Sequence, residues 1–413
     1  MAPVTARFRR TLTAWARSGV ALIVVLSACA GSNHTATPRS KPSASTTTVR
    51  TVVVVPVARI QRALDTLVSA HHAPGAVLGL RVRGGGAVEL VSGVEPGTRR
   101  PLTASDEFRV ASLTKTFIGA EILKLVQRGS VHLDDHIGKY VAGWPHGDEI
   151  TIRELLSHTS GIPPLGGDRG GPDPYSDAAF ALITSDLHRH FTPEEVLNFV
   201  RLRPLLFPPG SATSYSNINM ILLGQVITKI TGMSVGQTLH RDLLDPLHLR
   251  DTHYAAEEPA KPTAGLLLVG SELVSTALID NTSDITVGGA ASAMVMNIPD
   301  LLTWGEALLR DRTVVTGRVA ADAFRIAPGG TGLGVLGFSD TDGFCMFSDK
   351  GCPQGVTFSA IGGTGSGGGT RSVLLYDKKT DTVLTLAMNR ASTPGVEAFV
   401  VRAMQLISAA ERT

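Results

Sequence analysis

The stretch RVASLTKTFIGAEILKLVQRG, residues 109–129, places a serine three residues before a lysine at the start of an apolar run. Positions i and i+3 share one face of a helix, so we expect Ser112 Oγ and the Lys115 amine to touch. A core-facing stripe follows at helical spacing, formed by Phe117, Ile118, Ile122, Leu125 and Val126. Desolvation lowers the pKa of a lysine held among apolar groups, so that it can accept a proton from a neighbouring hydroxyl. The pair predicts a nucleophilic serine, and the alternative is a surface lysine beside an incidental serine.

The N-terminal region has the pattern of an export signal. Four arginines precede the apolar run GVALIVVL (residues 19–26), which is too short to span a bilayer. The run ends in LSAC (residues 26–29), which resembles the bacterial lipobox, in which the cysteine is lipidated and becomes the new N-terminus. We therefore expect a signal peptide at residues 1–28, a lipidated Cys29, and export to the outer face of the cell membrane. An ordinary signal with a chance cysteine is the alternative.

Charge and cysteine usage exclude several classes of function. Loss of residues 1–28 takes four of the 38 Lys+Arg and none of the 36 Asp+Glu, which leaves a formal charge of −2. With no basic patch that interleaves aromatic residues, the sequence does not predict nucleic-acid binding. Cys345 and Cys352 lie close together, and in an exported protein they predict one small disulfide loop. The neighbouring sequence lacks a His or Asp cluster, so neither a metal site nor a cofactor is predicted.

The rest of the 413-residue chain predicts one α+β domain. Residues 29–55 are rich in Ser, Thr and Pro and predict a tether, which leaves the domain at residues 56–413. A helix (residues 57–72) and a hairpin around residues 84–86 lie near one end of the domain. A second hairpin (residues 370–389) and a closing helix lie at the other end, and residues 112–309 are mainly helical. We expect one antiparallel sheet built from both chain ends, flanked by helices, with a helical insertion.

Two further motifs complement the serine and lysine. Tyr215 and Asn217 follow the turn-forming FPPG (residues 207–210) and precede an apolar helix, so both side chains can face one cleft. A phenol can relay a proton, and a carboxamide can both donate to a carbonyl and accept from an amide. The glycine-dense run AIGGTGSGGG (residues 360–369) feeds a strand, where glycine allows a ligand close to the backbone. Taken alone, these motifs would indicate a capped helix start and a loop.

The order and spacing of these motifs resemble the serine β-lactamase and penicillin-binding protein superfamily. Its class C branch, with carboxypeptidase and esterase relatives, matches best. The resemblance runs from Val57 to Ser408 and includes four segments without chemistry, at residues 129–141, 150–163, 230–252 and 288–309. It implies a β-lactamase/transpeptidase-like fold and an acyl substrate, either a small molecule or a peptide.

The resemblance also implies a role for each motif. Ser112 would be the acyl-accepting nucleophile, Lys115 and Tyr215 would share the acid–base work, and Asn217 would orient the substrate. Thr364, Gly365 and Ser366 would form the third substrate-binding motif. The N–H groups of Ser112 and Ser366 would form the oxyanion hole.

One departure from the family pattern changes the expected substrate. Gly363 stands where the family normally has Lys or His before Thr-Gly. Loss of a charge-assisted hydrogen bond to a carboxylate costs about 1.5–3 kcal/mol. We therefore expect an ester, amide or peptide whose recognised part is not a carboxylate. The alternatives are a D-Ala-D-Ala carboxypeptidase or β-lactamase in which another cation, such as Arg371, serves the carboxylate, or a non-catalytic envelope binding protein.

Two residue sets resemble catalytic groups but have simpler interpretations. Residues 194–198 match a class A deacylation motif, yet Thr192 and Glu195 around Pro193 predict a capping box at a helix start. His158 is expected to support the wall of the active site, because Lys115 and Tyr215 already provide the acid and base.

Overall fold

The computed structural model describes residues 55–82, 84–165, 181–182, 185–269, 272–278, 282–327, 330–339 and 359–410. The predicted signal peptide, Cys29, most of the predicted tether, Cys345 and Cys352 lie outside the described residues. The lipidation and the disulfide therefore stay predictions.

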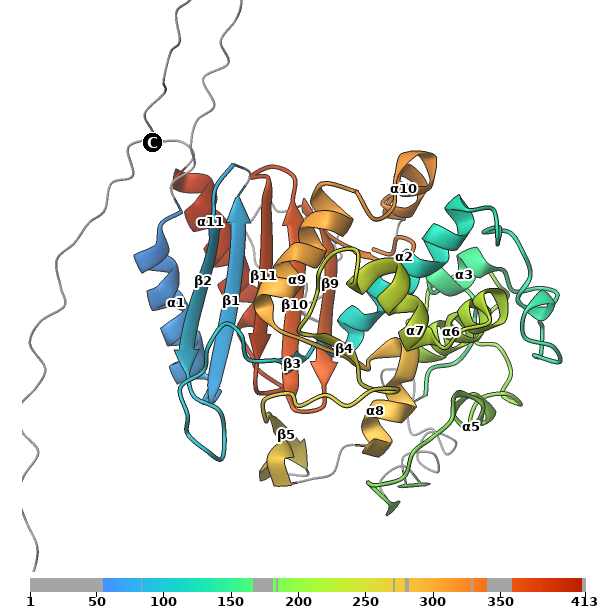
Figure 1. Cartoon of the computed structure of the whole chain (residues 1–413), viewed down its shortest axis with the longest axis horizontal. Helices are drawn as coiled ribbons and strands as arrows, with labels where there is room; N and C mark the ends of the chain where they lie inside the picture. The colour runs from blue at the N-terminus through green and yellow to red at the C-terminus, as the bar shows by residue number, and fades with distance from the viewer. Residues whose placement is uncertain are drawn as a thin grey trace, which may run out of the picture. The chain divides into compact units, whose positions relative to one another are not determined.

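Strands from both ends of the chain form one antiparallel sheet, in the order β2-β1-β11-β10-β9-β8 (Figure 1). Their bounds are β1 Gly75–Val82, β2 Ala87–Gly93, β8 Leu336–Ser339, β9 Ser359–Gly367, β10 Thr370–Asp377 and β11 Thr382–Met388. The register of β1 with β11 runs from Ala76 opposite Met388 to Val82 opposite Thr382. All seven residues of β11 are buried, because both faces of the sheet are covered. The predicted sheet of two terminal hairpins is confirmed.

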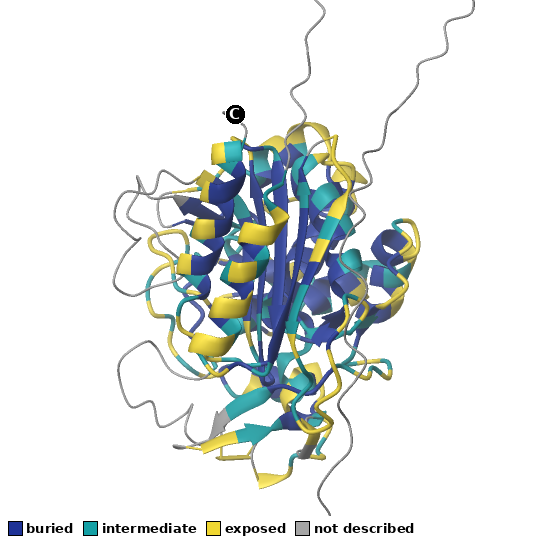
Figure 2. Cartoon of the chain, turned by 90° about the vertical axis from the view of Figure 1, so that its left-hand side faces the viewer, coloured by how far each residue is buried: buried dark blue, intermediate teal, exposed yellow. Residues whose placement is uncertain are grey.

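Two terminal helices cover one face of this sheet. They are α1 (Val57–Ala70) and α11 (Val396–Ala410). Figure 2 shows their exposed stripes facing outward above the buried strands. Ile60 and Leu64 of α1 and Val400 and Ile407 of α11 are fully buried in a core that they share with the sheet.

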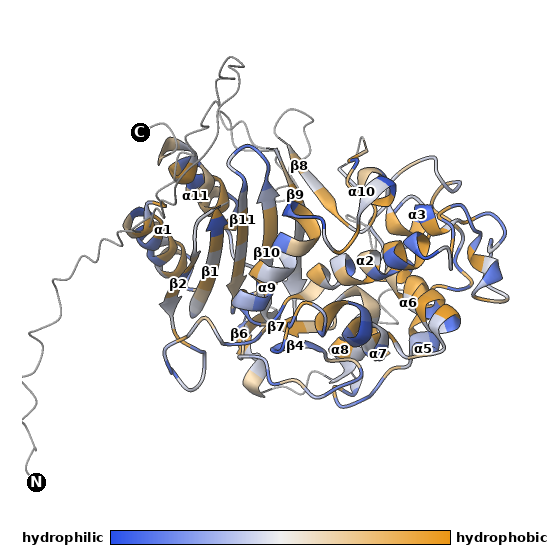
Figure 3. Cartoon of the chain, turned by 45° about the horizontal axis from the view of Figure 1, so that its top comes forward, coloured by the Kyte–Doolittle hydropathy of each residue, from blue (hydrophilic) through white to orange (hydrophobic). Residues whose placement is uncertain are grey.

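A mainly helical region lies on the other face (Figures 1 and 3). Its helices are α2 (Thr114–Gln127), α3 (Ile152–Leu156), α5 (Pro193–Asn198), α6 (Asn217–Thr231), α7 (Val235–Leu239), α8 (Thr282–Gly288), α9 (Ile298–Gly305) and α10 (Gly317–Ala323). Shorter 3-10 turns are η1 (Ala111–Leu113), η2 (Ile137–Lys139), η4 (Thr276–Leu278) and η5 (Gly289–Ala291). The π-helical turns are η3 (His240–Leu244) and η6 (Glu306–Arg310). The region also holds two small sheets that the sequence did not predict, β3 (Phe108–Arg109) with β7 (Met294–Met296) and β4 (Thr252–Tyr254), and β5 (Leu266–Val269) with β6 (Glu272–Ser275).

Helix α2 is more deeply buried than its sequence indicates. The pattern predicts one apolar stripe, whereas ten successive residues from Thr114 to Leu123, and Leu125 beyond them, are buried. Phe117 stacks on Trp304 of α9 with ring centroids 4.0 Å apart. A helix surrounded by protein holds the groups at its N-terminus in fixed positions.

Within the described ranges, no single helix has the length and apolarity of a membrane span. Helices at Asn217–Thr231 and Val235–Leu244 reach those limits only when taken together across a bend of 72°.

Candidate active site

Ser112 and Lys115 meet at the N-terminus of α2. Ser112 lies in the short turn η1, whose first residue, Ala111, has a left-handed φ of 46°. Lys115 Nζ donates to Ser112 Oγ at 3.1 Å and to the Ala291 carbonyl at 2.9 Å. These two hydrogen bonds hold the amine beside the hydroxyl.

The surroundings of Lys115 change its protonation. The side chain is only 5% exposed, and burial lowers its pKa to about 7. A buried ammonium loses hydration, so the neutral amine becomes a substantial species near neutral pH. Lys115 is therefore able to accept the Ser112 proton in this site.

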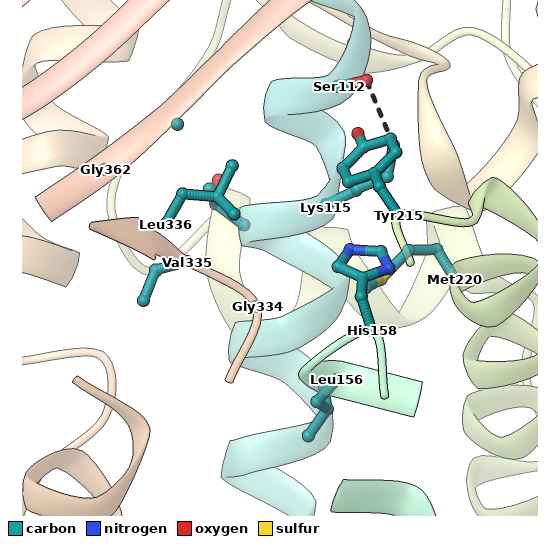
Figure 4. Close-up of a pocket in the computed structure, with 12 residues that line it drawn as sticks. Ser112, Lys115, Leu156, His158, Tyr215, Met220, Gly334, Val335, Leu336 and Gly362 are labelled. Carbon is teal, nitrogen blue, oxygen red and sulfur yellow. Dashed lines mark hydrogen bonds between the residues drawn. The ribbon is translucent and has the colours of Figure 1, made fainter. Parts of the chain in front are cut away.

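Tyr215 closes the site from the segment that leads into α6. Lys115 Nζ lies 4.7 Å from the centre of its ring. Burial of its inner side raises the pKa of Tyr215 to about 12, and its hydrogen bond with Ser112 acts in the opposite direction. The residue is still 40% exposed. Tyr215 thus carries its proton at neutral pH. Its ring lies beside Ser112 and Lys115 (Figure 4), and its exposed part is open to solvent.

His158 holds the Tyr215 segment in place. Its Nδ1 accepts from the Ser216 N–H at 3.3 Å and lies 3.2 Å from Asn219 Nδ2, while its carbonyl accepts from the Ser214 N–H at 2.9 Å. Its ring packs on the Tyr215 ring with centroids 4.5 Å apart. Burial, together with the nearby Lys115 charge, lowers the pKa of His158 to about 3. The imidazole is therefore neutral, as an acceptor at Nδ1 must be, and His158 supports the wall as the sequence predicts.

Asn217, the first residue of α6, has an unfilled acceptor. Its Oδ1 is buried and forms no hydrogen bond with the described residues. Buried polar atoms in native proteins are almost always paired. The carboxamide lines the same cavity as Ser112, so a ligand N–H is a suitable partner.

The glycine run that the sequence placed before a strand is itself the strand β9. Gly365 lies opposite Ser372 of β10. A Cβ at position 365 would collide with the Val110 carbonyl and lie 3.0 Å from the Ser112 nitrogen. Glycine therefore lets β9, with Thr364 and Ser366 on either side, run directly beside the nucleophile's backbone.

The structure also bears on Gly363 and Arg371. A Cβ at position 363 would point toward Leu113, at 2.9 Å, and Thr116. It would border a cavity of about 20 Å³ that Lys115, Tyr215 and His158 also line (Figure 4), a volume that suits about one water molecule. Arg371 pairs with Glu397 of α11 at 3.4 Å, whereas the hydroxyls of its neighbours Thr370 and Ser372 bind carbonyls near Ser112. Arg371 therefore lies on the opposite face of the sheet from the serine.

A larger cavity of about 170 Å³ opens on the other side of Ser112. Asn217, Ser366, Arg109 and Asp284 are among the residues that line it.

Residues 194–198, which match the class A deacylation motif, lie in helix α5. Thr192 Oγ1 accepts from the Glu195 N–H, and the Glu195 carboxylate accepts from the Thr192 N–H. The predicted capping box is confirmed. In the described part of the chain, no three His, Cys, Asp or Glu side chains are placed to hold a metal ion.

Comparison with known proteins decides the family. A family model described as Beta-lactamase matches residues 60–408. The chain belongs to the β-lactamase family. Ser112, Lys115, Tyr215, Asn217 and residues 363–366 all lie within the matched range.

Curated relatives match part of the chain. Protein flp of Staphylococcus aureus (strain NCTC 8325 / PS 47) is 27% identical over 263 residues, which cover 59% of this chain and 48% of flp. Penicillin-binding protein 4* of Bacillus subtilis (strain 168) is 27% identical over 197 residues, 47% of this chain and 40% of that protein. The chain thus spans half or less of the length of these relatives.

Solved structures match most of the chain. The D-amino acid amidase from Ochrobactrum anthropi SV3 has a TM-score of 0.71 at 23% identity, covering 86% of this chain and 99% of the amidase. A D-stereospecific amidohydrolase from Streptomyces sp. has a TM-score of 0.66 at 25% identity, covering 86% and 98%. Both agree with the β-lactamase/transpeptidase fold: an antiparallel sheet with flanking helices.

Sequence reasoning missed three groups of this β-lactamase-family site. The Ala291 carbonyl that binds Lys115 lies 176 residues from it. Arg109 and Asp284 come together in the larger cavity from distant segments. Ala291 lies in residues 288–309, one of the family-like segments expected to carry no chemistry, and its contact with Lys115 corrects that expectation. Arg109 begins the stretch that holds Ser112, whereas Asp284 lies in none of the motifs.

Proposed function

We propose that this chain is a serine hydrolase that forms an acyl-enzyme at Ser112 with an ester, amide or peptide. The observation that carries the proposal is the buried Lys115 amine, with a pKa of about 7, held 3.1 Å from Ser112 Oγ. A poised base in contact with a hydroxyl is the arrangement that activates a serine nucleophile.

The proposed reaction has two stages. Ser112 Oγ bonds to the substrate carbonyl carbon while its proton passes to Lys115 Nζ. The N–H groups of Ser112 and Ser366 stabilise the oxyanion, for which Gly365 leaves room beside the Ser112 nitrogen. Tyr215 gives its proton to the leaving oxygen or nitrogen as the bond from that atom to the carbonyl carbon breaks, and it takes the proton held by Lys115 in return. Water then attacks the acyl carbon, its proton returns through the same groups, and Ser112 is released with the free acid.

The lack of a cation at Gly363 gives an expected order of substrates. With no cation at this position, and with Arg371 on the far face of the sheet, a β-lactam or C-terminal carboxylate lacks the partner that the family supplies there. We therefore rank neutral esters and amides above β-lactams. The likeness to a D-stereospecific amidohydrolase supports amide hydrolysis as one such activity.

A fluorophosphonate probe tests the proposal. We expect the probe to label the unmodified protein, and we expect Ser112→Ala to abolish this labelling. Ser105 is exposed, so Ser105→Ala serves as the matched control and should keep the labelling. A p-nitrophenyl ester should give a burst followed by turnover. A folded protein that neither labels nor turns over would instead be a non-catalytic envelope binding protein, the alternative that the degenerate third motif favours.

A further inference from the structure

Two cavities lie beside Ser112. Ser112 lines both cavities; Lys115 and Tyr215 line the smaller one, and Asn217 and Ser366 line the larger one. In the proposed function, on which this inference rests, Tyr215 protonates the leaving group. The leaving group therefore departs past the exposed side of Tyr215 toward solvent, because the smaller cavity holds only about one water molecule. The acyl part of the substrate then occupies the cavity of about 170 Å³.

Two charged side chains, Arg109 and Asp284, line this acyl cavity, and Asp284 is the more exposed of them. Asp284, in the first turn of α8, has a side chain 62% exposed and lies 3.9 Å from Arg109. The Arg109 side chain is only 13% exposed. At 3.9 Å between charged atoms, water and a ligand can still compete for the carboxylate. Burial raises the pKa of Asp284 and the Arg109 charge opposes that rise. Because Asp284 is the more exposed member of the pair, its carboxylate is the charged group that a ligand in the acyl cavity reaches more easily.

A second acceptor in the acyl cavity is also unfilled. Asn217 Oδ1 is buried and has no hydrogen-bond partner among the described residues. A carboxylate and a carboxamide oxygen both require donors, and an ammonium group supplies three N–H donors with a positive charge. An acyl group without an N–H donor would leave Asn217 Oδ1 unpaired, and an anionic acyl group would in addition be repelled by Asp284.

We infer that Asp284 determines substrate specificity by binding an ammonium group on the acyl part, with Asn217 Oδ1 as the second acceptor. The substrate class is then an ester or amide of an amino acid with a free amine, or a peptide cleaved after its N-terminal residue. The chemistry at Ser112 stays as proposed above, because the ammonium group binds without taking part in bond breaking.

Arg109 provides the rival interpretation. Its guanidinium lines the same cavity, and a ligand that displaced Asp284 from it would be an acid. The rival predicts preference for an acyl group with a carboxylate, and that preference would depend on Arg109.

Three p-nitrophenyl esters separate these outcomes: alanyl (ammonium), propionyl (neutral) and succinyl (carboxylate), each corrected for hydrolysis without enzyme. For the full chain we expect kcat/KM for alanyl to exceed propionyl about tenfold, and Asp284→Asn to abolish most of that ratio. Asp65→Asn, an exposed acid on α1 across the sheet, is the matched control and should keep the ratio. A ratio that Asp284→Asn leaves unchanged, or a succinyl preference that Arg109→Gln removes, overturns the inference.

Two further measurements keep the test decisive. The alanyl to propionyl ratio of the unmodified protein should fall as salt rises from 0.05 to about 0.5 M, because salt screens exposed charges; a constant ratio counts against Asp284. This arm needs no variant to fold. If the fluorophosphonate probe and all three esters fail, the proposed function is wrong, whereas labelling of Ser112 without an alanyl preference refutes only the role of Asp284.

Discussion

Gly365→Ala is the most direct test of how β9 approaches the nucleophile. The new Cβ would lie 2.5 Å from Ser372 Oγ, would collide with the Val110 carbonyl and would reach the Ser112 nitrogen at 3.0 Å. Ser372 Oγ can rotate away, but the Val110 carbonyl belongs to the backbone and lies closer still, so β9 must move by more than about 0.5 Å to bring that contact to about 3.0 Å. Loss of one oxyanion donor slows acyl transfer by about 10²–10³-fold, and displacements of this size are enough to misplace a donor. We expect the acylation rate to fall by about 10²-fold.

The matched control is Gly363→Ala, two residues away on the same strand. Its Cβ meets the flexible end of Leu113 at 2.9 Å and no backbone atom within 4 Å among its three nearest contacts. We therefore expect the control to keep acylation within about threefold, roughly 0.6 kcal/mol. The assay is the burst rate with a p-nitrophenyl ester, with Tm measured for both variants. A folded Gly365→Ala protein that acylates as fast as Gly363→Ala would refute this account of the oxyanion hole.

Four other predictions follow from the site and the N-terminus. Because Lys115 must be neutral to accept a proton and its pKa is about 7, acylation should rise with pH through about 7 and then level off; a pH–rate profile whose limb lies near the ordinary lysine value contradicts this. His158→Phe keeps a ring against Tyr215 but removes the acceptor of the Ser216 N–H. An unpaired buried N–H costs about 1–3 kcal/mol, so the Tyr215 segment should shift and turnover should fall about tenfold. An unchanged kcat would show that the hydrogen bond does not position Tyr215. Gly363→Lys should raise nitrocefin hydrolysis relative to ester hydrolysis about tenfold, or about 1.4 kcal/mol, because the φ of Gly363 lies outside the left-handed region and the new Cβ displaces only the end of Leu113. The rest of the lysine side chain must extend beyond the cavity of about 20 Å³. An unaltered ratio would mean that the cation is not what limits β-lactam turnover. Cys29→Ala should move the protein from membrane to soluble fractions, and continued membrane association would argue against the predicted lipid anchor.

Local patterns in the sequence predicted the parts of the fold that local physics determines. Helical periodicity located α1 and α11, and turn residues located both terminal hairpins, because these signals act over a few residues. The contact between Ser112 and Lys115 is likewise a consequence of one helical turn.

Tertiary contacts decided what the sequence could not show. Four of the nine residues of β9 are glycines, a composition that favours a loop, yet pairing with β10 makes the segment a strand. The carbonyl of Ala291 and the carboxylate of Asp284 reach the site from distant segments. Residues 288–309, which contain Ala291, resemble the family, but their sequence does not show that a backbone carbonyl there binds Lys115. The burial of α2 on all sides follows from neighbours that the helix meets only in the folded chain.

The pairing of β1 with β11 affects how the chain is made as well as what it does. The Gly75 N–H donates to Asn389 Oδ1, across 314 residues of sequence. Seven of the eight β1 residues are buried in the folded sheet. During synthesis β1 can pair with β2, but its other edge stays unpaired until β11 has been made. Contacts this distant form late and slowly. A ribosome that stops before residue 382 would release a chain containing Ser112, Lys115 and Tyr215 but lacking the central strand of its sheet, and we expect aggregation of that fragment in place of partial activity.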